Sequence, residues 1–165
     1  MKGSERERTM EICDYEERFH DEVIDLVLGI QNGEYDLGFT LAEQPDLADI
    51  QTTFADGGFW VALDEGRVVG CIGLQRKGSQ EGVLKKFFVD GSLRGKRVGL
   101  SLYEKLEAFC RAEGITAVVL DTPRVATRSH AFYEKAGFRE ISADELPFPY
   151  EYPDRDCLLF LKTFD

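Results

Sequence analysis

A run of basic residues and glycines, LRGKRVGL from Leu93 to Leu100, stands out in a chain whose formal net charge is −11. It follows a β-rich segment and opens a long helical pattern, where unpaired amides and the helix dipole favour an anion. The glycines allow close approach and the basic side chains add charge, so the run predicts a pyrophosphate site. The residues of this site are Arg94, Gly95, Lys96, Arg97, Val98, Gly99 and Leu100. A helix start that is basic only for solubility and turn geometry is the alternative.

Two other phosphate-binding motifs do not fit the run. GxxxxGK followed by Ser or Thr would indicate a P-loop, and GxGxxG would indicate a dinucleotide-binding fold. The run matches neither pattern. Nucleoside triphosphates and dinucleotides are therefore disfavoured as ligands.

Hydrophobic periodicity predicts alternating strands and helices in a single domain, residues 1–165. The predicted strands are 9–14, 59–63, 68–74, 84–89, 115–120, 138–141 and 157–162. The predicted helices are 19–30, 45–54, a long helix after the turn 90–93 that stops at Gly114, and 127–136, with a loop at 34–43. A strand, a helix and a strand follow one another from 84 to 120, which predicts a parallel pair and a mixed sheet.

Composition limits the classes of partner. Hydrophobic residues make up 43% of the chain and charged residues 31%, which is typical of a soluble globular protein. The negative net charge disfavours nucleic acid. No apolar run is long enough for a membrane span or a signal peptide, so we expect a cytoplasmic protein without a membrane partner. The widely spaced cysteines predict reduced thiols and no metal site: Cys13, Cys71, Cys110 and Cys157.

A second motif, FYEKAGF at residues 132–138, lies beyond the basic run and the strand that ends in Val89. In this order the motifs resemble the GNAT family of N-acetyltransferases. The family signature is Gln or Arg, two residues, Gly, one residue, and Gly or Ala. Arg94 and Gly99 match it, and the order of elements resembles the family over about residues 10–142.

The resemblance implies an α/β (α+β) fold. It consists of a mixed, mostly antiparallel central sheet, about four flanking helices, and a splayed parallel strand pair that binds coenzyme A. Two positions depart from the family pattern. The family's first Gly is Arg97 here, and the Asn often found seven residues before the helix tyrosine is Ala126. Arg97 keeps its amide donor, whereas Ala126 removes one contact to the cofactor arm.

The resemblance also implies a mechanism, in which an amine attacks the thioester of acetyl-CoA directly. The pantetheine arm would pair with the strand edge at Phe88 and Val89, and amides near Phe88 would polarise the carbonyl. Tyr133 is similar to the family's general acid, since a tyrosine pKa of about 10 is close to a thiol pKa of about 8.5. Helix spacing places Ser129 and Tyr133 toward the cleft and Phe132 toward the core. A half-buried packing tyrosine is the alternative for Tyr133.

The acceptor ammonium must lose a proton before it attacks, so a base or a water chain is needed. Glu81, at the start of the strand that leads to the cofactor, is the catalytic candidate. Glu34 and Asp36 are the substrate-binding candidates, because the resemblance places the acceptor site in their loop. The acidic loop suggests a cationic acceptor. The alternative for each of these carboxylates is a solvated surface charge, which is the more common role of such residues.

Two functions of different classes fit these observations. The first is an N-acetyltransferase acting on a primary amine of a small molecule or peptide, and the second is a non-catalytic acyl-CoA sensor or partner module. Replacing Tyr133 by Phe distinguishes them, because only an enzyme has turnover to lose. The bulk of Phe87 and Phe88 disfavours a longer acyl group. The family often forms dimers, and the aromatic loop 148–152 is the candidate contact for a homodimer.

Overall fold

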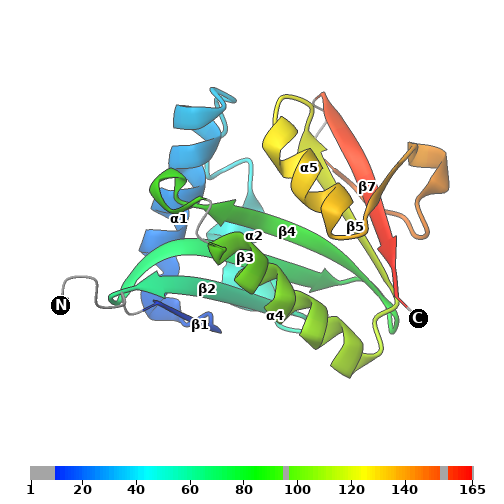
Figure 1. Ribbon diagram of the computed structural model, residues 1–165, viewed down its shortest axis with the longest axis horizontal. Coiled ribbons are helices and arrows are strands. Elements are labelled where there is room, and N and C mark those ends of the chain that lie inside the picture. The colour runs from blue at the N-terminus through cyan, green and yellow to red at the C-terminus, as the bar shows by residue number, and fades with distance from the viewer. Residues whose placement is uncertain (1–9, 95–96, 153–155, 165) are drawn as a thin grey trace.

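Seven strands form one sheet at the centre of the protein (Figure 1), in a computed structural model that describes residues 10–94, 97–152 and 156–164. Their order across the sheet is β1-β2-β3-β4-β5-β7-β6. The strands are β1 (Met10–Asp14), β2 (Gly58–Asp64), β3 (Arg67–Arg76), β4 (Glu81–Val89), β5 (Ala117–Pro123), β6 (Arg139–Ile141) and β7 (Cys157–Thr163). Neighbouring strands are antiparallel except β4 and β5, which are parallel. The expected mixed, mostly antiparallel sheet is confirmed.

The helices lie on both faces of this sheet. They are α1 (His20–Gly29), α2 (Pro45–Ala48), α3 (Ile50–Thr53), α4 (Val98–Glu113) and α5 (Thr127–Lys135). Buried side chains of α4 and α5 share one hydrophobic cluster, and those of α1, α2 and α3 share another. Figure 1 shows α4 crossing in front of the sheet. Within the described ranges, no helix has the length and apolar character needed to cross a membrane.

The second predicted helix, 45–54, is wrong as a single element, because it divides at Asp49. The backbone of Asp49 has φ −134° and ψ 74°, outside the helical region, and its carboxylate accepts a hydrogen bond from the Thr52 amide at 3.3 Å. Asp competes with the helix by such local bonds and prefers caps. The loop in the structure is shorter than the predicted loop 34–43, because a π-helical turn (Ile30–Glu34) continues α1.

Strands β4 and β5 pair only at their first residues. Glu81–Val83 lie beside Ala117–Val119, and no register between the two strands continues past these described residues. Beyond them β4 stays with β3, and β5 stays with β7 over its whole length. The two strands therefore diverge toward their C-terminal ends, as Figure 1 shows. Among the residues that the structure describes, the edge of β4 toward β5 has no neighbouring strand beyond Val83.

A β-bulge interrupts β4 within this divergent part. Cys71 of β3 pairs with Phe88, whereas Gly73 pairs with Lys85, so Lys86 and Phe87 together face a single β3 residue. Lys86 has a positive φ of 55°. A bulge of this kind bends the strand and redirects side chains.

The aromatic loop between β6 and β7 packs on its own sheet. Phe148, Tyr150 and Tyr152 lie against a cluster that includes Val119 of β5 and Leu161 of β7. The loop thus covers the face of β5 and β7 that α5 leaves open. Its aromatic side chains are engaged within the protein.

Candidate active site

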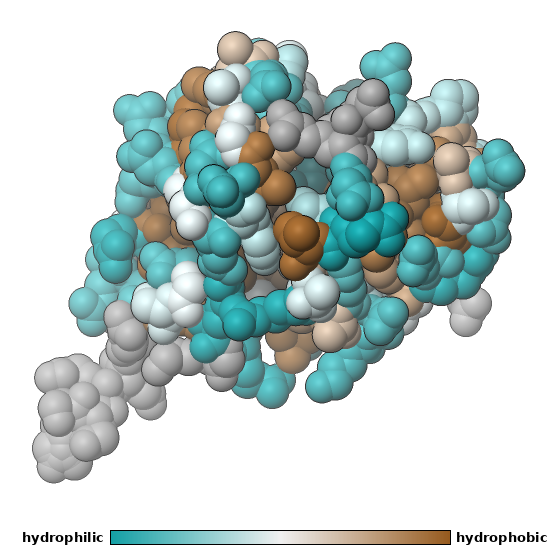
Figure 2. Space-filling model, turned by 90° about the horizontal axis from the view of Figure 1, so that it is seen from above, coloured by the Kyte–Doolittle hydropathy of each residue, from teal (hydrophilic) through white to brown (hydrophobic). Residues whose placement is uncertain are grey.

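A cavity of about 1830 Å³ lies where β4 and β5 diverge. Its walls come from the turn after α1, from α2, from the ends of β4 and β5, from the starts of α4 and α5, and from the aromatic loop. Seen from above, the molecule shows apolar side chains set among hydrophilic ones (Figure 2). The divergence of the strands thus creates a site that reaches both faces of the sheet.

The start of α4 forms one end of this cavity. Arg97, Gly99 and Leu100 line it, whereas Val98 is buried in the core at 3% exposure. A Cβ on Gly99 would lie 3.6 Å from Phe87 Cζ and 3.7 Å from Val89 Cγ2, so the helix packs closely on β4 there. The predicted site residues Gly95 and Lys96 lie outside the described residues.

Arg94 also lines the cavity, and two other elements hold its guanidinium. Its Nη1 lies 2.8 Å from both carboxylate oxygens of Glu34, and its Nη2 donates to the Val89 carbonyl at 3.0 Å. The predicted cofactor residue and the predicted acceptor residue therefore form an ion pair with each other. Asp36 is exposed and does not line the cavity. These positions give no support to a cationic acceptor site in this loop.

The left-handed backbone of Arg97, with φ 66°, gives a physical reason for the glycine of the family signature. Glycine adopts this conformation freely, whereas a residue with a Cβ is strained by about 1–2 kcal/mol. We expect Arg97→Gly to be more stable than Arg97→Ala by about 1 kcal/mol, although both remove the same charge. Urea unfolding of the two variants measures this difference. Equal stabilities would mean that the left-handed backbone is not strained.

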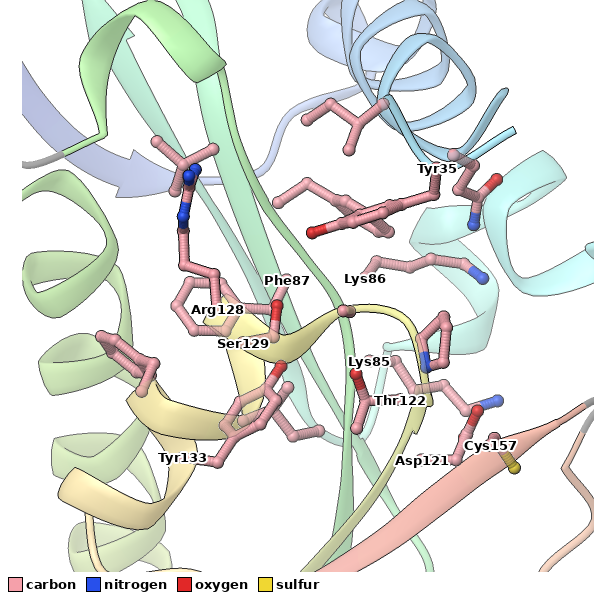
Figure 3. A pocket seen from close by; sticks show the side chains of 18 of the residues that line it. Tyr35, Lys85, Lys86, Phe87, Asp121, Thr122, Arg128, Ser129, Tyr133 and Cys157 are labelled. Carbon is pink, nitrogen blue, oxygen red and sulfur yellow. The ribbon is translucent and has the colours of Figure 1, made fainter. Parts of the chain in front are cut away.

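Tyr133 points its hydroxyl into the cavity from α5 (Figure 3). Its ring packs between aromatic side chains, with centroids 6.1 Å from Phe87, 5.8 Å from Phe138 and 6.0 Å from Phe160. The hydroxyl has no hydrogen-bond partner among the described residues. Burial raises the pKa of Tyr133, and the nearby charge of Asp121 raises it further. Tyr133 therefore keeps its proton at neutral pH.

The expected division of α5 is not strict: Phe132 packs against the core and the Tyr133 hydroxyl faces the cavity as expected, but the Tyr133 ring is buried in the core and Phe132 also lines the cavity. Tyr133 is 6% exposed and belongs to the main core cluster, while Phe132 is half-buried, and both line the cavity. The reason is that α5 inserts the Tyr133 ring between the sheet and Phe138, so that only the hydroxyl end reaches the opening. Ser129, one turn earlier, lines the cavity as expected.

Glu81, Phe88 and Val89 occupy opposite ends of β4. Phe88 and Val89 line the cavity at the divergent end. Glu81 lies at the paired end, and its side chain covers the turn from β3, where a Cβ on Gly78 would lie 2.8 Å from Glu81 Oε1. Glu81 is not among the residues that line the cavity. The structure does not bring it to Tyr133.

Asp121 is a carboxylate in the cavity that sequence reasoning missed. It belongs to β5, two residues beyond the last residue paired with β4, and it is half-buried. The Tyr150 hydroxyl donates a short hydrogen bond to Asp121 Oδ1. Its position in the otherwise apolar run AVVLD was the available signal, since a carboxylate at the end of a buried strand needs a specific role.

Sequence reasoning also missed Lys85 and Lys86. Both line the cavity from β4, and both contact Asp46 of α2. Lys86 Nζ lies 2.7 Å from Gln44 Oε1 and 3.3 Å from Asp46 Oδ2, and Lys85 Nζ lies 3.4 Å from the same carboxylate oxygen. Burial lowers the pKa of Lys86, and the Asp46 charge offsets part of this effect. Burial by itself would raise the pKa of Asp46. The positive charges of Lys86 and Lys85 have the larger combined effect, so the pKa of Asp46 is lowered.

Comparison with known proteins places this geometry in a family. Residues 24–138 match the acetyltransferase (GNAT) family. An acetyltransferase structure from Streptococcus agalactiae 2603 is 42% identical, with a TM-score of 0.90, and the match covers 94% of this chain and 98% of that one.

Curated relatives agree with this match. An IAA acetyltransferase from Azospirillum brasilense is 38% identical over 68% of this chain and 72% of its own length. N-acetylaspartate synthetase from Danio rerio is 34% identical over 61% of this chain, but the match spans only 37% of that protein. The chain belongs to the GNAT family of acetyltransferases.

Proposed function

We propose that this protein transfers the acetyl group of acetyl-CoA to a primary amine of a small molecule or peptide. The observation that carries the proposal is the unpaired edge of β4 in a cavity shared with the start of α4 and the Tyr133 hydroxyl. This combination offers an edge for an extended amide-bearing arm, amides at a helix start for phosphates, and a proton donor. Each of the three has a role in transfer from a thioester.

The residues that line the cavity fit acetyl-CoA as the cofactor. The cavity has the volume for a long ligand, and Gly99 at the start of α4 lies beside Phe87 and Val89 of β4. Phe88 and Val89 would flank the arm, while Arg97 would face its phosphates. When bound, acetyl-CoA supplies an acetyl group activated as a thioester. In the transfer, the amine nitrogen bonds to the acetyl carbon and the carbon–sulfur bond breaks.

Two side chains would move the protons. Asp121 would accept the proton that the acceptor ammonium must lose, and its hydrogen bond from Tyr150 holds the carboxylate in place. Tyr133 would donate a proton to the sulfur leaving group. Burial raises the pKa of Tyr133, which keeps the donor protonated, and the same apolar surroundings make a thiolate more basic. In this proposal Asp121, and not Glu81, is the base that accepts the proton of the acceptor ammonium.

The test is thiol release with acetyl-CoA and a panel of primary amines. We expect amine-dependent release that saturates with the preferred acceptor, together with formation of the acetylated amine in a ratio of one to one. A protein that binds CoA tightly but releases no thiol with any amine would instead be a sensor or partner module. That result would overturn the proposed function.

We also propose a cytoplasmic location for the protein. Among the residues that the structure describes, all the cysteines are free thiols: Cys13, Cys71, Cys110 and Cys157. Free thiols are typical of a reducing compartment. The homodimer stays a proposal, and its candidate contact, the aromatic loop, packs on its own sheet.

A further inference from the structure

The β4 bulge places two consecutive lysines on the same face of the sheet. In a regular strand, neighbouring side chains point to opposite faces. Here Lys85 and Lys86 both reach Asp46 of α2, at 3.4 Å and 3.3 Å. The alternation resumes after the bulge, because Phe87 packs toward α5 and Phe88 packs in the cluster on the α1 side. The bulge thus concentrates two positive charges in the part of the cavity next to α2.

The position of Lys86 in the bulge is unfavourable for the stability of the folded protein. Its backbone lies in the left-handed region, with φ 55°, which favours glycine. Its side chain is only 13% exposed, and an ammonium in such surroundings loses much of its hydration. Backbone strain and a desolvated charge in one residue are typical of a functional position.

Neighbouring groups hold the Lys86 ammonium but do not neutralise the pair. Gln44 accepts a hydrogen bond from Lys86 Nζ at 2.7 Å, and the Gln44 amide in turn donates to Gln31 at 2.9 Å. Asp46 is the one described carboxylate within 4 Å of the two ammonium groups, which share its Oδ2. One negative charge faces two positive charges. These three side chains therefore carry one positive charge in excess, while Glu43, which also lines the cavity, is exposed.

The other wall of the cavity contributes a carboxylate, that of Asp121. Asp121 lines the cavity from β5, whereas Lys85 and Lys86 line it from β4, and all three are labelled in Figure 3. A ligand with an ammonium and a carboxylate can meet both walls, with its ammonium at Asp121 and its carboxylate at the lysines. A simple amine would leave the lysines without a counter-charge from the ligand.

We propose that Lys86, together with Lys85, binds a carboxylate of the acceptor, so that the acceptor is a small amino acid rather than a simple amine. The inference rests on the proposed function, because it concerns the acceptor half of the same site. It replaces the cationic acceptor suggested by the acidic loop, whose Glu34 is paired with Arg94. The opposing view is that the lysines serve only to anchor α2 through Asp46.

The first test compares α-amino acids with the amines that remain when their α-carboxylate is replaced by hydrogen. For the preferred amino acid, we expect the wild-type kcat/KM to exceed that of the matching amine by about 10- to 100-fold, as for a charge-assisted hydrogen bond. Lys86→Met should abolish most of this preference through a higher KM for the amino acid. Lys105→Met, at an exposed position of α4, is the matched control and should keep the preference.

A second variant should act in the opposite direction. Asp46→Asn removes the internal carboxylate that competes for the lysines, but it keeps the oxygen that accepts from the Leu47 amide at 2.9 Å. We expect the KM for the amino acid to fall several-fold. If the lysines only anchor α2, Asp46→Asn will lower the thermal stability and leave the KM unchanged.

The outcomes separate this inference from the proposed function. Equal kcat/KM values for amino acids and matching amines in the wild type would overturn the carboxylate site and leave the acetyltransferase intact. Absence of thiol release with every acceptor would overturn the function. In that case, calorimetric titration of the CoA complex with the amino acids decides the inference. Binding that requires Lys86 would support it, and absence of binding would overturn it.

Discussion

Replacing Tyr133 by Phe should lower kcat by about 10²- to 10⁴-fold, while the dissociation constant for CoA stays within about twofold of the wild-type value. The variant keeps the ring that packs against Phe138 and Phe160, so the cavity should retain its shape. It removes only the hydroxyl that points into the cavity. Single-turnover kinetics and calorimetric titration with CoA measure the two quantities.

Tyr103→Phe is the matched control for this experiment. Tyr103 is also buried, at 3% exposure, but its hydroxyl faces Lys162 Nζ at 3.1 Å, away from the cavity. We expect kcat to remain near the wild-type value in this variant. A similar loss in both variants would show that the effect comes from packing, and would remove Tyr133 from the chemistry.

The pH profile gives an independent readout for Tyr133. Because burial raises its pKa above the ordinary value of about 10, the donor form persists below that pH and is lost only above it. The wild-type rate should therefore rise with pH as the acceptor amine loses its proton, without a decline caused by Tyr133 below about pH 10. A decline near neutral pH would identify a different acid.

Phe160→Ala should destabilise the fold by about 3–5 kcal/mol. Phe160 of β7 is 1% exposed and packs against both Tyr133 and His130 of α5. Its removal leaves a cavity between β7 and the helix that carries the proposed acid. Equilibrium urea unfolding measures the change in the free energy of unfolding.

Phe148→Ala provides the comparison, because it makes the same substitution in the half-buried aromatic loop. We expect a loss of about 1–2 kcal/mol there, since less apolar area leaves water in the folded state. If Phe148→Ala cost as much as Phe160→Ala, the aromatic loop would be as important to the core as the layer between β7 and α5.

Much of the framework could be predicted from local patterns. Alternating and helical periodicities located the strands and the long helix, because burial on one face imposes these repeats directly on the sequence. The family was predictable from the basic run at Arg94 and the motif at Tyr133. The second helix was the main error, since a single side chain, Asp49, ends one turn and begins another.

The part of the cavity that we propose for the acceptor was less predictable, because its residues come from distant parts of the chain. Lys85, Lys86 and Asp121 carry no motif, and they meet only because β4 and β5 diverge and β4 is bulged. Likewise, Glu34 was a reasonable candidate for substrate binding until the fold placed it against Arg94, 60 residues away in sequence.

The sequence by itself determined the order of the elements and the family, since short-range patterns and motifs encode both, and it supplied Tyr133 as the candidate proton donor that we propose. Only the tertiary structure decided which charges share the cavity. A one-residue change in strand register moves a side chain to the other face, and no local pattern records that shift.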